Sequence, residues 1–191
     1  MVGRGRPPGR GGDHRTGARP DLAEQLARPD ALLAFVAALL TGIAAAIATF
    51  TVSVPGRSRR WSLLPAPALG LWLLSLGWGC FSDWLRLGPD GLALGHSVDC
   101  LEAILIISLP LGLVLLFMVR HAGFARPRTT ALLGALAVSA LASAGVTLFH
   151  DLDTALMVLV WHLGPVALLS LGSWAAGERL FAWLAPARVS R

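Results

Sequence analysis

Five long apolar segments, separated by short polar links, dominate this chain of 191 residues. They cover residues 31–54, 61–81, 101–119, 129–149 and 154–176. At a rise of about 1.5 Å per residue, each segment can cross a hydrocarbon core of about 30 Å as a helix. A helix satisfies its own backbone hydrogen bonds, which lipid cannot do for it. The sequence therefore predicts an all-α fold, a polytopic transmembrane bundle of about five spanning helices.

The composition argues against a soluble domain. Hydrophobic residues make up 55% of the chain and charged residues 14%, which leaves too few polar side chains to cover a soluble protein. Arg, Gly and Pro dominate as far as Gly17, and such a segment cannot bury a core. We predict that residues 1–30 form a disordered tail with part of an outer loop, and that residues 31–191 form one helical membrane domain.

Arginine is distributed unevenly between the links, and this predicts the orientation of the helices. Loops on the cytoplasmic side of a membrane carry an excess of Arg and Lys. The links after the first and third segments and the chain after the fifth are rich in arginine, whereas the other two links hold Arg86 alone. The arginines are Arg57, Arg59, Arg60, Arg120, Arg126, Arg128, Arg179, Arg188 and Arg191. We predict that these links and the C-terminus are cytoplasmic, although alternation then puts an arginine-rich N-terminal tail outside.

Proline and small residues predict local features of the spans. Pro65 and Pro67 stand near the start of the second segment, Pro110 midway along the third and Pro165 within the fifth. Proline removes a backbone donor, and in transmembrane helices the result is usually a bend. We therefore expect kinks at these positions. The fourth segment is crowded with Gly, Ala and Ser, which favours close contact with neighbouring helices.

The only two cysteines are predicted to lie at the same membrane face. Cys80 is at the outer end of the second segment and Cys100 is at the start of the third. In a bacterium that face is the oxidising periplasm. The two thiols can form a disulfide, act as oxidant sensors, or bind a soft metal together with His96 or His150. Alternatively, each is an inert, small apolar residue.

His162 lies eight residues into the fifth segment, roughly 12 Å below its outer end. An ionisable group at that depth is a candidate functional residue. The alternative, which we favour, is a neutral imidazole that is hydrogen-bonded to a neighbouring helix. The chain contains no nucleotide-binding loop, nucleophile elbow or HExxH motif, and the spacing of its Cys and His residues matches no standard zinc pattern. We therefore predict neither an enzyme nor a bound cofactor.

From Ala18 onward the chain resembles the NrsF family (negative regulator of sigma F), which are bacterial inner-membrane anti-sigma factors. The matching stretches are ARPDLAEQLARPD from Ala18, SVPGRSRRWSLLP from Ser53, GCFSDWLRLGPDGLALG from Gly79 and LFHDLDTALMVLVWHLGPV from Leu148. The resemblance implies a multi-pass protein of the bacterial inner membrane. It also implies a further helix ahead of the position of Ala18, so that six spans are expected in the full-length family.

The same resemblance implies a function and a partner. Such a protein holds an extracytoplasmic-function sigma factor inactive at the membrane and releases it when oxidants or heavy metals reach paired cysteines. By position, Cys80 and Cys100 correspond to that pair. The partners implied are the sigma factor and the lipid bilayer, with no direct contact with nucleic acid. Two alternatives stay open: a thiol-dependent membrane protein for redox or metal handling, and a scaffold subunit without a site of its own.

Overall fold

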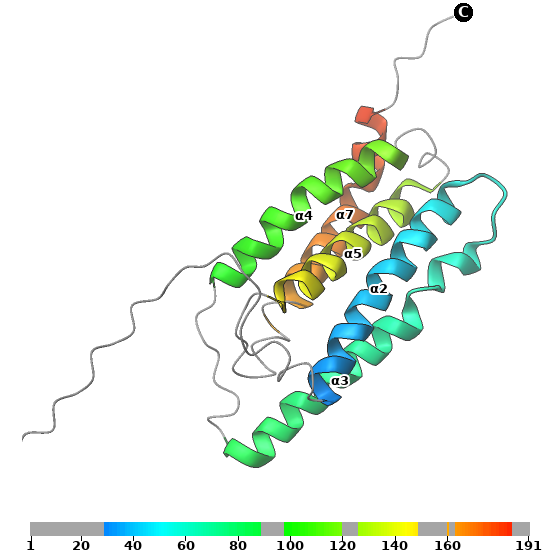
Figure 1. Ribbon diagram of the computed structural model, residues 1–191. Coiled ribbons are helices and arrows are strands. Elements are labelled where there is room, and N and C mark those ends of the chain that lie inside the picture. Colours follow the sequence, from blue (N-terminus) through cyan, green and yellow to red (C-terminus); the bar gives the residue numbers. More distant parts are fainter. Residues whose placement is uncertain (1–28, 89–97, 120–125, 149–159, 161–162, 185–191) are drawn as a thin grey trace, which may run out of the picture.

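The structure is a computed structural model that describes residues 29–88, 98–119, 126–148, 160 and 163–184. These residues form five α-helices and one 3₁₀ helix, η1, and the α-helices run up and down in a bundle (Figure 1). The bounds are α2 Pro29–Ser53, η1 Arg59–Leu63, α3 Ala66–Leu87, α4 Val98–Val119, α5 Pro127–Val146 and α7 Gly164–Leu184. The predicted all-α bundle is confirmed.

Helix α5 is at the centre of the bundle. It packs extensively against α2 on one side and α7 on another, and it also contacts α4, whereas α3 packs against α2 (Figure 1). In the apolar part of α5, 72% of the residues are buried, compared with 17% in the segment that contains α3. Helices α3 and α4 therefore lie on opposite flanks, separated by α2 and α5.

Three of the described helical segments are long and apolar enough to span a membrane: α2, the segment Arg59–Arg86, and α5. The part of α4 from Ile104 to Val119 is a shorter apolar helix. Large apolar side chains cover the outside of the bundle, among them Leu74, Leu109 and Leu168, which are each about 70% exposed. Such an outer surface suits lipid and not water, so the chain is a multi-pass membrane protein.

Small residues allow the central helices to approach closely, as the composition of the fourth segment predicts. A Cβ atom added to Gly42 of α2 would lie 2.6 Å from Cγ of Leu141 in α5. A Cβ atom added to Gly134 of α5 would lie 2.8 Å from Cδ2 of Leu115 in α4. Next to Gly42, the hydroxyl of Thr41 donates to the carbonyl oxygen of Ala37 at 2.7 Å. The buried hydroxyl therefore has its hydrogen-bond partner within its own helix.

The prolines differ from the expected pattern of kinks. Pro110 does lie inside α4, as predicted. In contrast, Pro65 and Pro67 stand at the start of α3, after the separate turn of η1, and Pro165 is the second residue of α7. The first turn of a helix does not need the missing N–H group, so proline is well tolerated there. Pro65 and Pro67 therefore start a helix and do not bend it. Leu163, just before α7, is π-helical, so the chain is already helical ahead of Pro165, and the kink expected there stays a prediction.

Candidate functional site

The described helices divide the charged residues between the two ends of the bundle. One end contains the end of α2, η1, the starts of α3 and α5 and the end of α7 (Figure 1). We call it the arginine end, because it carries Arg57, Arg59, Arg60, Arg126, Arg128 and Arg179. Glu178 is the only acidic residue that the described segments contribute there.

The opposite end contains the start of α2, the end of α3 and the start of α4 (Figure 1). We call it the cysteine end. Its described segments carry the acidic residues Asp30, Asp83, Asp99 and Glu102, with Arg86 as their basic residue. Counted over the described residues, the arginine end is therefore positive and the cysteine end negative.

Contacts between arginines and their neighbours join separate segments at the arginine end. Arg126, just before α5, donates a hydrogen bond of 2.9 Å from Nη2 to the carbonyl oxygen of Arg57, 69 residues away. The Arg128 Nε atom lies 3.0 Å from Glu178 Oε1, and the guanidinium carbon of Arg128 is 5.3 Å from the centre of the Trp174 ring. The start of α5 therefore contacts both the link after α2 and the last turns of α7.

The close approach of α5 and α7 at this end depends on Gly177. A Cβ atom at this position would lie 2.8 Å from Cα of Arg128 and 2.9 Å from the carbonyl oxygen of Pro127. Both of these are backbone atoms, which cannot rotate away as a side chain can. Gly177 therefore brings the neighbouring Glu178 within reach of Arg128.

The ion pair itself is a weak source of stability. The side chains of Arg128 and Glu178 are 47% and 62% exposed. An ion pair with that exposure contributes about 0–1 kcal/mol, because water screens it and two long side chains must be ordered. The contact therefore orients the exposed arginine more than it stabilises the bundle.

Cys80 lies deeper in its helix than predicted. Helix α3 continues for seven residues beyond it, to Leu87, so the thiol is about 10 Å from the end of the helix. The hydropathy pattern predicted that the helix ends near Cys80. This prediction is wrong, because the half-buried Cys80 lies within α3. Cys100 is the third residue of α4, at the same end of the bundle but on the opposite flank. Pairing of the two thiols stays one of the alternatives that the sequence left open.

The three candidate histidines, His96, His150 and His162, lie outside the described residues. Within the segments that the structure describes, no three His, Cys, Asp or Glu side chains are grouped so as to hold a metal ion. The metal site that would combine a cysteine with His96 or His150 is therefore untested.

The contacts at the arginine end were not predicted from the sequence. Arg126 and Arg57, or Arg128 and Glu178, are too far apart along the chain for any local pattern to pair them. The exposed tryptophan Trp174 also gave no signal, since aromatic residues are common in membrane helices near the interface. Only the packing of α7 on the start of α5 brings these groups together.

Comparison with known proteins gives one match. A family model described as "NrsF: Negative regulator of sigma F" matches residues 15–183. No curated protein matches the chain, and no solved structure matches it.

Proposed function

The chain belongs to the NrsF family of negative regulators of a sigma factor, and we propose that it holds an extracytoplasmic-function sigma factor inactive at a bacterial inner membrane. The observation that carries this proposal is the family match, which extends over residues 15–183. A regulator of this kind acts by binding its partner, and membership of the family implies that it is not an enzyme.

The surface that we assign to sigma-factor binding is the arginine end. A sigma factor works in the cytoplasm, so its membrane-bound regulator must present the docking surface on that side. The excess of arginine supports a cytoplasmic position for this end. Arg57, Arg59 and Arg60 are exposed there, next to the exposed indole of Trp61. Exposed guanidinium groups bind carboxylates well, so we expect them to contact an acidic patch on the sigma factor.

The test is retention of the sigma factor on membranes. We expect the double variant Arg59→Gln, Arg60→Gln to retain at least about tenfold less of the co-expressed sigma factor, which corresponds to about 1.4 kcal/mol of lost binding energy. Arg86→Gln, at the cysteine end, is the matched control and should retain it normally. Equal retention of the sigma factor by the two variants would show that the docking surface lies elsewhere. Failure of the wild type to retain any sigma factor would refute the proposed function.

We further propose that Cys80 and Cys100 sense the inducing oxidant or heavy metal. Support comes from their correspondence by position to the paired cysteines of the family, and the flanks on which they lie determine what pairing would do to the bundle. Cys80 is on α3, which packs against α2, and Cys100 is on α4, which packs against α5. A disulfide requires Cα atoms about 4.4–6.8 Å apart, so a bond between the two thiols would draw the two flanks together. Such a movement would pass through α2 to η1 and the arginine end.

Induction in cells tests the sensing step separately from binding. Cys80→Ser and Cys100→Ser should leave the protein in the membrane and the sigma factor bound, yet abolish induction of the sigma-dependent promoter by oxidant or metal. Ser82→Ala, on the same helix as Cys80, is the control and should respond normally. If both cysteine variants also respond normally, the signal is sensed elsewhere, while the binding proposal stands.

A further inference from the structure

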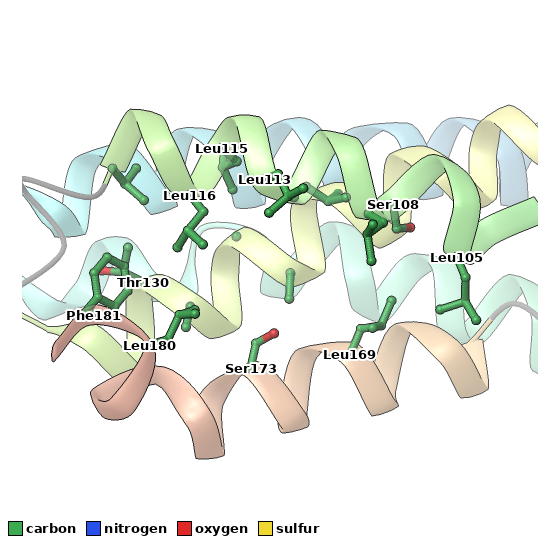
Figure 2. Close-up of a pocket in the computed structure, with 17 residues that line it drawn as sticks. Leu105, Ser108, Leu113, Leu115, Leu116, Thr130, Leu169, Ser173, Leu180 and Phe181 are labelled. Carbon is green, nitrogen blue, oxygen red and sulfur yellow. The ribbon is translucent and has the colours of Figure 1, made fainter. Parts of the chain in front are cut away.

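A groove runs along the bundle between α4 and α7, with α5 as its floor (Figure 2). Its volume is about 390 Å³. Leucines of α4 and α7 line its two sides, including Leu105, Leu113, Leu169 and Leu180, and α4 and α7 themselves scarcely touch. The groove is therefore an apolar cleft on the side of the bundle, and none of the described residues fills it.

The dimensions of the groove determine what can occupy it. Its lining extends along α4 from Leu105 to Val119, which is about 21 Å at 1.5 Å per residue. A groove of this length with an apolar lining suits one extended hydrocarbon chain.

Two of the side chains that line the groove carry hydroxyl groups without a hydrogen-bond acceptor. Thr130 and Ser108 both line it and are 1% and 6% exposed, and neither hydroxyl has a partner among the described residues (Figure 2). In contrast, the buried hydroxyls of Thr41 and Thr49 in α2 each donate to a carbonyl oxygen one turn earlier. Among the residues that the structure describes, the buried donors that lack a partner belong to α4, α5 with its preceding residue, and α7. They are Ser108, Arg126, Thr130, Ser143 and Ser170.

One end of the groove meets the arginine end. Thr130 lies one helical turn after Arg126, on the same side of α5, and its N–H donates to the carbonyl oxygen of Arg126 at 2.9 Å. The guanidinium of Arg126 uses Nη2 to bind the carbonyl oxygen of Arg57, but its Nη1 is buried without a partner. Thr130 therefore marks the place where the groove reaches the arginine end, while Arg126 precedes it outside the lining of the groove.

We propose that the groove binds one acyl chain of an anionic phospholipid, whose phosphate group lies at the arginine end, where the groove reaches Thr130. Phosphate oxygens accept hydrogen bonds and carry no donor, so they suit guanidinium groups. The phosphate is negative, and this end carries six arginines against Glu178 alone among the described residues.

The test uses the whole chain, reconstituted in vesicles of equal amounts of phosphatidylglycerol and phosphatidylcholine, then extracted in mild detergent and examined by native mass spectrometry. We expect the wild type to retain a single phosphatidylglycerol. Gly112 lines the groove, and a Cβ atom there would meet nothing within 4 Å, so the side chain of Gly112→Leu has room to fill the groove. This variant should retain about tenfold less of the lipid, as a loss of 1.4 kcal/mol in affinity would produce.

Gly172→Leu is the matched control, because Gly172 also has open space around its Cβ position but does not line the groove. It should retain phosphatidylglycerol as the wild type does. Equal retention of the two lipids by the wild type would overturn the proposal. So would equal phosphatidylglycerol in the two leucine variants, or an altered oligomeric state in Gly112→Leu with unchanged lipid.

Discussion

Two glycines of α7 provide a matched pair for testing how closely α7 packs against α5. Gly177 is buried against the backbone of Pro127 and Arg128, whereas a Cβ atom at Gly172 would meet nothing within 4 Å. Replacing either glycine by alanine adds one methyl group to the same helix. Alanine favours a helix by about 1 kcal/mol over glycine, and this gain is common to both variants. The difference in the free energy of unfolding between the two variants therefore measures the cost of the steric clash at Gly177.

The expected difference follows from the contact distances. A methyl group at Gly177 would stand 2.8 Å from Cα of Arg128, well inside van der Waals contact, and neither partner is a flexible side chain. Extra methyl groups forced into packed sites typically cost about 1–3 kcal/mol. We therefore expect Gly177→Ala to unfold more readily than Gly172→Ala by about 1–3 kcal/mol, or about 2–4 °C in Tm per kcal/mol for a chain of this size.

Thermal unfolding in mild detergent, followed by tryptophan fluorescence and circular dichroism, would measure this difference. Gly172→Ala should be as stable as the wild type or more so, which controls for the change of composition. If the two variants unfold within about 0.5 kcal/mol of each other, α7 does not approach the start of α5 as described, and the Arg128–Glu178 contact loses its structural basis.

Three further outcomes follow from the structure and the sequence. A periplasmic phosphatase fused after Arg191 should be inactive, since the arginine end is expected in the cytoplasm, and an active fusion would reverse the assigned orientation. Arg128→Ala should lower the free energy of unfolding by less than about 1 kcal/mol, because its ion pair is half exposed. Chemical denaturation in detergent measures this change, and a larger loss would contradict the prediction. His162→Leu should preserve membrane insertion and change stability by about 1 kcal/mol, as expected for one interhelical hydrogen bond; normal protein levels with lost induction would instead assign it to signalling.

Hydropathy predicted three of the helices closely. The segments 31–54, 101–119 and 129–149 correspond to α2, α4 and α5, each with both ends within about three residues. In these regions an apolar stretch and a helix have nearly the same limits. For α2 and α5 the first turn begins at a proline, Pro29 or Pro127, which is favourable at a helix start.

The second and fifth helices extend beyond their predicted ends because charge does not end a helix. Helix α3 passes Asp83 and Arg86 and stops at Gly88, whose φ of 63° is easy for glycine and whose N–H donates to the carbonyl oxygen of Trp84. Helix α7 continues to Leu184, eight residues beyond the predicted end, and includes Glu178, which pairs with Arg128. A hydropathy window stops at such residues, but their long side chains can reach water or each other.

The candidate site was predictable only in part. The sequence indicated that arginines collect on one side of the membrane, because that distribution follows from the links between spans. It did not indicate the hydrogen bond from Arg126 to Arg57, or the groove beside Thr130, because both depend on which helices are neighbours. The order of packing, with α5 between α2 and α7, cannot be deduced from apolar segments of similar length.

The central position of α5 has a consequence for how the protein is made. Small residues give α5 little apolar surface to offer to lipid, and most of that surface is covered by α2, α4 and α7 in the finished bundle. During synthesis α5 emerges before α7, so it must enter the bilayer beside α2 and α4 while one of its faces is still uncovered. We therefore expect truncated chains that end between α5 and α7 to be recognised by membrane quality-control proteases more readily than chains that end before α5.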